Sequence, residues 1–347
     1  MKAEITPYVL KFKFEAGTSR GVLTEKKTWF ITVYENSLKG IGECGPLKGL
    51  STDDRIDFED KLFDICNKLH QYSMPATEAE CLDLAGNIVP DELPSVRFGV
   101  ETALLDLLNG GKKIIFDNAF SKGNQSIPIN GLIWMGKKDF MLEQIKHKLK
   151  EGYSCLKMKI GAINFQQECE LLEFIRNQFS ESELALRVDA NGAFTFEEAK
   201  EKLKILRQYG IHSIEQPIKA KQLKEMAELV KLNLLPIALD EELIGIHTTE
   251  QKVELLEIIN PPYIILKPTL VGGIRSCREW INLAEERNIA WWITSALESN
   301  TGLNAIAQFT AEYDIKIPQG LGTGQLYRNN VESGLTIKRG ALYCKIG

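Results

Sequence analysis

A series of apolar runs that each end in a charged residue constrains the fold of this chain more than any other feature. The charged residues are Lys159, Asp189, Glu215, Asp240 and Lys267. Successive members lie about 25 to 30 residues apart, and a strand with its crossover helix takes roughly 30 residues, so each step matches one βα unit. We therefore predict that the five charges stand at the carboxyl ends of five consecutive parallel strands.

Strand-like and helical patterns alternate through residues 126–324. One example is TFEEAKEKLKILRQYG, which Thr195 and Glu198 open with the spacing of a capping box. Such alternation is typical of parallel βαβ units. Only a closed barrel gathers five neighbouring strand ends around one mouth, because strands of an open sheet lie about 4.8 Å further apart at each step. The predicted fold class is therefore α/β, a TIM-like (β/α)7–8 barrel with a last short strand near 316–322.

In the first 125 residues, strand patterns come first and helical patterns follow, which predicts an α+β domain. Gly17 and Gly21 lie in the connection between its first two strands. We expect the tail, about 325–347, to add a strand to this domain because it lacks a helical pattern. The predicted elements are strands over 4–14 and 28–35, a glycine-rich loop over 40–51, and helices over 53–71 and 95–108.

Composition excludes several classes of protein. The net charge of −5 is small and no basic run is present, which argues against a nucleic-acid partner. Seven scattered cysteines without CxxC spacing argue against disulfides or a thiolate zinc site and favour the cytoplasm. No apolar stretch approaches the ~20 residues of a membrane span, and charges interrupt the N-terminus too often for a signal peptide. The sequence carries no signal for an oligomeric state.

The three acids of the series predict a metal site. Carboxylate oxygens on neighbouring strands suit Mg²⁺, or Mn²⁺, and leave positions open for water or substrate. Such a site binds a small-molecule carboxylate substrate and neutralises the second negative charge when the proton α to that carboxylate leaves. The four histidines and the thiols are not placed to contribute.

The lysines on either side of the acids predict proton transfer. Lys157 lies two residues before Lys159 on the same strand face. Its charge and that of a nearby metal cation disfavour the protonated form of Lys159, whereas the nearby carboxylates favour it. Lys267 is a second acid/base or a fixed cation. Arg187 and Asn191 share a strand face with the first acid of the triad.

Each motif also has a plain structural interpretation. The KMK run at 157–159 resembles a solvated strand edge, and residues 189–192 resemble a turn. Asp240 and Glu241 suit a helix N-terminus, and Glu215 suits the end of a strand. The common register of all five charges argues against these interpretations jointly.

These motifs resemble the enolase superfamily, in its muconate-lactonizing-enzyme-like subgroup. The resemblance extends over nearly the whole chain. The matching residues are KMK at 157–159, RVDANGAF at 187–194, IEQP at 214–217, LDEE at 239–242 and LKPTLVGG at 266–273.

The resemblance implies a role for each position. Lys159 would be the catalytic base, supported by Lys157 and Arg187, and Lys267 would be its partner across the site. Residues 1–125 would form a capping domain, completed by the tail, whose loops around 17–22 and 45–51 close over the substrate. The Mg²⁺ ligands would be Asp189, Glu215 and Asp240, with Asn191 and Glu241 beside them.

Within the subgroup the chain is most similar to the o-succinylbenzoate synthases. The similarity rests on PSVRFGVETALLDL (94–107), the Arg187-x-Asp189 pair, SALESNTGL (295–303) and GLGTGQLY (320–327). It implies a syn dehydration of 2-succinyl-6-hydroxy-2,4-cyclohexadiene-1-carboxylate in menaquinone biosynthesis, through an enediolate that the metal stabilises. Candidate contacts to the succinyl arm are Arg20 and Ser295, and a solvated loop cation is the alternative for Arg20.

Other outcomes remain compatible with the same lysines. N-acylamino acid racemases and dipeptide epimerases use the same half-reaction, and muconate cycloisomerisation is a third option. Dipeptide epimerases hold the substrate ammonium with acids near the last strand, and this chain has Gly322 where many relatives carry an acid. A non-catalytic barrel is disfavoured because all five charged positions are present.

Overall fold

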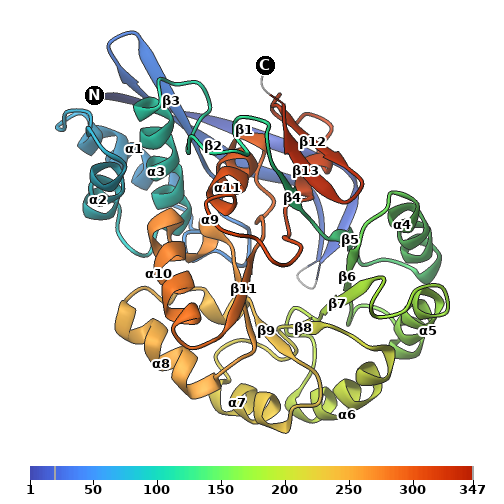
Figure 1. Cartoon of the computed structure of the whole chain (residues 1–347). Helices are drawn as coiled ribbons and strands as arrows, with labels where there is room; N and C mark the ends of the chain where they lie inside the picture. The colour runs from blue at the N-terminus through green and yellow to red at the C-terminus, as the bar shows by residue number, and fades with distance from the viewer. Residues whose placement is uncertain (19–20, 346–347) are drawn as a thin grey trace.

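The N-terminal part of the chain forms an antiparallel sheet covered by helices. The computed structural model describes residues 1–18 and 21–345. The three strands pair in the order β1-β2-β3, and α3 packs against β3 beside the barrel (Figure 1). The elements of this part are β1 (Lys2–Thr18), β2 (Gly21–Glu35), β3 (Leu38–Cys44), α1 (Phe58–Leu69), α2 (Glu78–Ile88) and α3 (Pro94–Leu108).

Three features of this domain differ from the sequence predictions. Gly17 and Gly21, expected in the connection between the first two strands, lie within β1 and β2. The start of the predicted loop over 40–51 is strand β3, whose glycines allow close packing rather than a turn. A Cβ on Gly42 would lie 1.8 Å from the carbonyl oxygen of Gly99 in α3. Helix α2 was not predicted, although Thr77 and Glu80 form a capping box at its start.

Residues from 126 onward form the predicted barrel of parallel strands and outer helices. Seven strands pair in the order β11-β10-β9-β8-β7-β6-β5. The strands are β5 (Gly131–Ile133), β6 (Cys155–Lys159), β7 (Ala185–Asp189), β8 (Ser213–Glu215), β9 (Ile237–Leu239), β10 (Tyr263–Leu266) and β11 (Ala290–Ile293). The helices are α4 (Lys138–Lys150), α5 (Phe165–Arg176), α6 (Phe196–Leu206), α7 (Leu223–Leu232), α8 (Thr249–Ile259), α9 (Pro268–Val271), α10 (Gly273–Glu285) and α11 (Asn300–Thr310), with short 3₁₀ turns η1 (Arg207–Tyr209), η2 (Glu241–Leu243) and η3 (Thr323–Gln325).

A short segment at Gln319 and Gly320 closes the barrel. Gly320 bridges Thr294 after β11, and Gln319 bridges Ile129 before β5, both in the parallel sense. The Gln319 N–H donates to the carbonyl of Pro128 at 2.8 Å, and the Gly320 N–H donates to the carbonyl of Ile293 at 2.8 Å. This segment occupies the eighth position, as the expected last strand near 316–322 requires.

The tail differs in part from the prediction. Its strand β12 (Leu335–Lys338) pairs with β13 (Ala341–Cys344), and β13 pairs with β4 (Ser126–Pro128), so neither joins the first sheet. Residues 326–329 do reach the first domain, because the Lys13 N–H donates to the carbonyl of Leu326 at 2.8 Å. The tail therefore joins both parts, while the limits of the two domains at 125 and 325 stay predictions.

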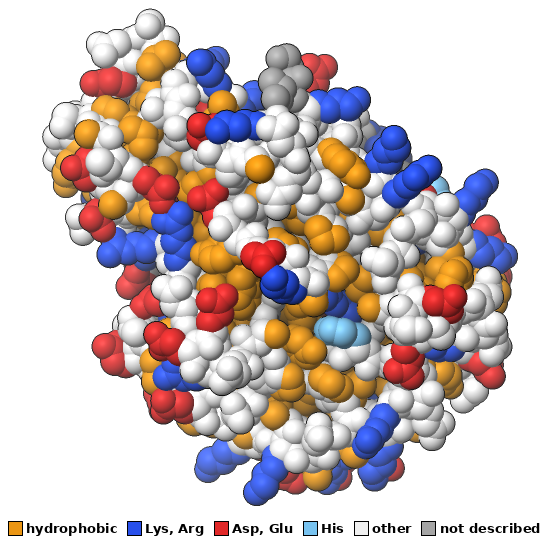
Figure 2. Space-filling view, in the orientation of Figure 1, with side chains coloured by type: hydrophobic (Ala, Val, Ile, Leu, Met, Phe, Trp, Pro, Cys, Tyr) orange, Lys and Arg blue, Asp and Glu red, His pale blue; other side chains and the backbone are white. Residues whose placement is uncertain are grey.

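One face of the molecule carries charged side chains that form no single patch (Figure 2), and the described cysteines form no disulfide. Figure 2 shows acidic and basic side chains interspersed around the face in view rather than gathered into one patch. All seven cysteines are free, as their scattered positions predict. Within residues 1–18 and 21–345, no helix combines the length and the apolar character needed to cross a membrane.

Candidate active site

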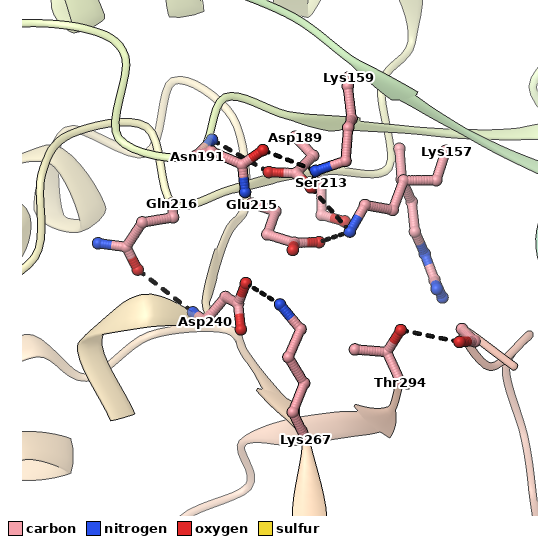
Figure 3. Close-up of polar contacts among 12 residues, drawn as sticks. Lys157, Lys159, Asp189, Asn191, Ser213, Glu215, Gln216, Asp240, Lys267 and Thr294 are labelled. Carbon is pink, nitrogen blue, oxygen red and sulfur yellow. Dashed lines mark hydrogen bonds and ion pairs between the residues drawn. The ribbon is translucent and has the colours of Figure 1, made fainter. Parts of the chain in front are cut away.

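The five charged residues stand at the ends of five consecutive strands, as predicted (Figure 3). Lys159 is in register with Asp189 across β6 and β7, and Asp189 is in register with Glu215 across β7 and β8. Asp240 directly follows β9, and Lys267 directly follows β10. The period of one βα unit thus places the charges around the carboxyl-terminal mouth of the barrel, where barrel enzymes have their chemistry.

Lysine amines and carboxylates pair throughout this mouth. The Lys157 amine lies 2.9 Å from Asp189 Oδ2 and also binds Glu215. The Lys159 amine lies 3.0 Å from Asp189 Oδ2, and the Lys267 amine binds Asp240. All three carboxylates are at least 98% buried, so the ammonium groups compensate charges that would otherwise be costly to bury.

Burial and pairing shift the pKa values of these groups in different directions. Burial alone would lower the pKa of Lys157, but the charges of Asp189 and Glu215 outweigh it and raise that pKa. Burial would raise the pKa of Asp189, but the three lysines lower it well below its usual range. Burial and the charge of Asp189 raise the pKa of Glu215 to about 8. The Lys157 amine therefore stays protonated beside these carboxylates.

Two of the predicted metal ligands, Asp189 and Glu215, share the Lys157 amine. Asp240 is instead paired with Lys267. Among residues 1–18 and 21–345, no three acidic, cysteine or histidine side chains surround one point closely enough to hold a metal ion. The donor chemistry nevertheless fits Mg²⁺, which prefers carboxylate oxygens. Glu215 Oε1 is buried and has no hydrogen-bond partner within the described part of the chain. An acceptor left in this way is costly, and a cation bound there would satisfy it.

Polar side chains orient the charged groups. The Lys159 amine donates to Asn191 Oδ1 at 2.7 Å, and Asn191 Nδ2 donates to Glu241 Oε1 at 3.0 Å. Both residues thus lie beside the acids, as expected. Gln216, which the sequence did not single out, accepts a hydrogen bond from the Asp240 N–H at 3.2 Å. Its left-handed φ of 39° is the kind of strain that a functional site retains.

The remaining candidate residues have different environments. Arg187 Nη1 donates to the carbonyl of Pro318 at 2.8 Å, and its guanidinium lies 4.0 Å from the ring centroid of Trp292. These contacts place Arg187 in the barrel interior, and its catalytic support stays a prediction. Ser295 lines the cavity and shares a 2.6 Å hydrogen bond with Thr323. Arg20 lies outside the described residues.

A cavity of about 260 Å³ opens between the barrel mouth and the N-terminal domain. Leu47 and Leu50 line it from the predicted loop at 45–51, and Phe14 and Leu23 line it from β1 and β2. Four lysines also line it, namely Lys148, Lys157, Lys159 and Lys267. Asp189 is the single acid among the described residues that line it. This enclosed space with a cationic floor suits a small anionic molecule.

Comparison with known proteins finds one matching family profile and, among the relatives, two synthases of the same name. Residues 141–344 match the profile of the family described as enolase C-terminal domain-like. The chain is 49% identical to the o-succinylbenzoate synthase of Desulfotalea psychrophila over 354 residues, which cover 96% of each chain. It is 29% identical to the o-succinylbenzoate synthase of Bacillus subtilis over 65% of this chain and 62% of the relative.

Solved structures with a similar fold include one from Desulfotalea psychrophila and one from Enterococcus faecalis. The crystal structure of MenC from Desulfotalea psychrophila matches with a TM-score of 0.86 and 45% identity, covering 99% of both chains. A dipeptide epimerase from Enterococcus faecalis, crystallised with Mg and the dipeptide L-Leu-L-Tyr, matches with a TM-score of 0.85 and 18% identity over 99% of this chain and 96% of that one. The second likeness shows the fold alone.

Proposed function

We propose that this chain, which belongs to the enolase superfamily, is an o-succinylbenzoate synthase, a Mg²⁺-dependent dehydratase of menaquinone biosynthesis. It would convert 2-succinyl-6-hydroxy-2,4-cyclohexadiene-1-carboxylate into 2-succinylbenzoate. The 49% identity to a synthase of that name over 96% of both chains supports this assignment. The free cysteines are consistent with a cytoplasmic enzyme.

The charge of the cavity is the observation that carries the choice of substrate. Four lysines and one acid line it. Each of these lysines is paired with a carboxylate, and the one acid, Asp189, is itself paired with Lys157 and Lys159. The feature that decides the choice is therefore the lack of an uncommitted acid in the described lining. The proposed substrate carries two carboxylates, which suit these ammonium groups. A dipeptide carries an ammonium group, for which the lining offers no uncommitted carboxylate among the described residues. The same cavity therefore disfavours the epimerase alternative.

Lys159 is placed to act as the base and then as the acid. Its amine lines the cavity beside Asp189 and would take the proton α to the ring carboxylate. The hydroxyl then leaves from the adjacent carbon on the same face, and the amine returns the proton to it. One C–H and one C–O bond break, water leaves, and the ring becomes aromatic.

Other residues stabilise the charge that develops. Lys267 lies across the site from Lys159 (Figure 3), and the charges of Asp240 and Glu215 outweigh burial and raise the pKa of its amine. It would thus remain a fixed cation beside the carboxylate oxygens. Asp189, Glu215 and Asp240 would hold Mg²⁺, which when bound supplies further positive charge to those oxygens. Mn²⁺ has the same preference for oxygen ligands.

A spectrophotometric assay of aromatisation tests the proposal. We expect wild-type enzyme to convert the cyclohexadiene substrate when Mg²⁺ is present, and Lys159→Ala to lose about 10²–10⁴-fold in kcat, the usual contribution of a general acid/base. Lys204→Ala is the control, because Lys204 forms an exposed pair with Glu201 on α6. Substantial dehydration by Lys159→Ala, or solvent deuterium incorporated at a dipeptide α-carbon by wild-type enzyme, would contradict the assignment.

A further inference from the structure

One wall of the cavity is a tight turn that follows β11. Thr294, Ser295, Ala296 and Leu297 all line the cavity. Leu297 has a φ of 65°, in the left-handed region that branched residues rarely adopt. Such strain persists only where surrounding contacts hold the backbone in place.

Three contacts hold this turn from within the barrel and the tail. The Leu297 N–H donates to Ser295 Oγ at 3.1 Å, and the Ala296 N–H donates to Glu298 Oε2 at 2.8 Å. The Tyr327 hydroxyl donates to the carbonyl of Leu297 at 2.7 Å. The turn is thus fixed at successive residues up to Glu298, where α11 is about to begin.

The next residue, Ser299, is held by the N-terminal domain. Glu43, at the end of β3, is fully buried. Its Oε1 accepts a hydrogen bond from the Ser299 N–H at 2.9 Å, and its Oε2 accepts from Ser299 Oγ at 2.5 Å and from the Gly302 N–H at 2.9 Å. A carboxylate at this helix start satisfies N–H groups that have no partner within the helix.

The packing around Gly302 leaves no room for a side chain. A Cβ on Gly302 would lie 3.0 Å from Glu43 Oε2 and 2.8 Å from the Glu298 Cβ. Glu43 therefore fixes the start of α11, and with it the end of the strained turn. Within residues 1–18 and 21–345, the hydrogen-bond partners of the Glu43 carboxylate are Thr28, Ser299 and Gly302. None of these is one of the five charged residues of the barrel mouth, so the contact acts on the wall and not on the proton-transfer groups.

We propose that Glu43 is a positioning residue, which sets the shape of the cavity wall at 294–297 from the N-terminal domain and so controls substrate affinity. The inference rests on the proposed function, because it takes the dicarboxylate substrate to lie against this wall. Loss of the carboxylate would leave backbone donors at Ser299 and Gly302 without their acceptor and let the turn relax. Substrate would then bind more weakly, whereas Lys159 and its neighbours would keep their geometry.

Glu43→Gln tests this, with Glu101→Gln as a matched control. Glu101 is likewise a buried carboxylate of the N-terminal domain that binds the start of a barrel helix, through the N–H groups of Ile274 and Arg275 in α10. Neither carboxylate lines the cavity, but the N–H groups bound by Glu43 closely follow the wall at 294–297, whereas those bound by Glu101 lie in α10. The measurements are KM and kcat for dehydration, the Kd of 2-succinylbenzoate by titration calorimetry, and Tm.

We expect Glu43→Gln to raise KM and Kd about tenfold, the effect of a lost hydrogen bond to a charged group, with kcat within about twofold of wild type. Glu101→Gln should leave KM within about twofold of wild type. Ser299→Ala, which removes only the hydroxyl donor, should raise KM by roughly threefold and decides the matter if Glu43→Gln does not fold.

Three results would overturn the inference: an unchanged KM in Glu43→Gln or in Ser299→Ala, an equal rise of KM in Glu43→Gln and Glu101→Gln, or a fall in kcat at constant KM. These are distinguishable from failure of the proposed function. If the proposed function were wrong, the wild-type enzyme would neither convert the cyclohexadiene substrate nor bind 2-succinylbenzoate.

Discussion

Replacing Lys157 with methionine should destabilise the metal-free protein strongly. Methionine keeps the length of the side chain but removes the charge that pairs with Asp189 and Glu215, both at least 98% buried. Removing one partner of a buried ion pair costs about 3–5 kcal/mol. An unfolding entropy of roughly 2.1 cal/mol/K per residue converts this cost into a fall in Tm of about 4–7 °C for a chain of 347 residues.

Thermal unfolding with and without Mg²⁺ measures the effect. Samples in EDTA give the metal-free Tm, and samples in excess Mg²⁺ give the response to the cation. We expect Mg²⁺ to raise the Tm of Lys157→Met more than that of wild type, because the amine and the cation compete for the same carboxylates in the wild-type protein. Lys204→Met removes an exposed charge of the pair with Glu201 and should change Tm by less than about 1 °C.

The charge balance described for the site would be refuted by a metal-free Lys157→Met protein that melts within about 1 °C of wild type. It would also be refuted by a Mg²⁺ response equal in the two proteins. The first result would mean that the amine does not compensate the carboxylates. The second would mean that the cation binds elsewhere.

Three further outcomes follow from the contacts. Asp189→Asn should weaken Mg²⁺ binding at least about tenfold in titration calorimetry, because it removes an anionic ligand; an unchanged affinity would place the cation elsewhere. Burial raises the pKa of Glu101 to about 7. An acid whose folded pKa is raised contributes stability that is fully present below its unfolded pKa and is lost as pH rises through the folded value. Wild type should therefore lose stability relative to Glu101→Gln between about pH 4.5 and 7 in urea unfolding, and a constant difference would contradict the shift. Gly42→Ala should destabilise by several kcal/mol or prevent folding, because its Cβ would lie 1.8 Å from the Gly99 carbonyl oxygen. Gly86→Ala, in helix α2, would place its Cβ at an ordinary contact distance of 3.5 Å from Arg275 Nη1 and should be neutral or stabilising by up to about 1 kcal/mol. Equal effects of the two changes would contradict the packing.

The barrel and its charged register could be predicted because both follow from local periods. A βα unit has a typical length, and side chains alternate between the faces of a strand, so Lys159, Asp189 and Glu215 fall in register without knowledge of any distant contact. The same reasoning predicts which face of a strand a side chain lies on, but not how deep in the barrel it lies. Arg187 shares a face with Asp189, yet it contacts Trp292 and the Pro318 carbonyl within the barrel.

Contacts between distant segments could not be predicted. Glycine marks both turns and sites of close backbone approach, so Gly42 suggested a loop where the chain has a strand packed on α3. The tail strand β13 pairs with β4, more than 200 residues earlier in the chain. Glu43 and Ser299 are 256 residues apart, and nothing in either local sequence indicates the other.

Two glycines of the closing segment, Gly320 and Gly322, have different explanations. Packing within the fold explains the first, and the proposed substrate explains the second. A Cβ on Gly320 would lie 1.9 Å from Thr294 Oγ1, so packing explains this glycine. A Cβ on Gly322 would lie 3.6 Å from the nearest atom, the Asn130 carbonyl oxygen, and the φ of Gly322 is −87°. The fold therefore has room for a side chain at 322, in the wall of a cavity that holds four lysines. An acid there would add negative charge beside a dicarboxylate, and its absence agrees with the proposed dehydratase rather than with an enzyme that must bind an ammonium group.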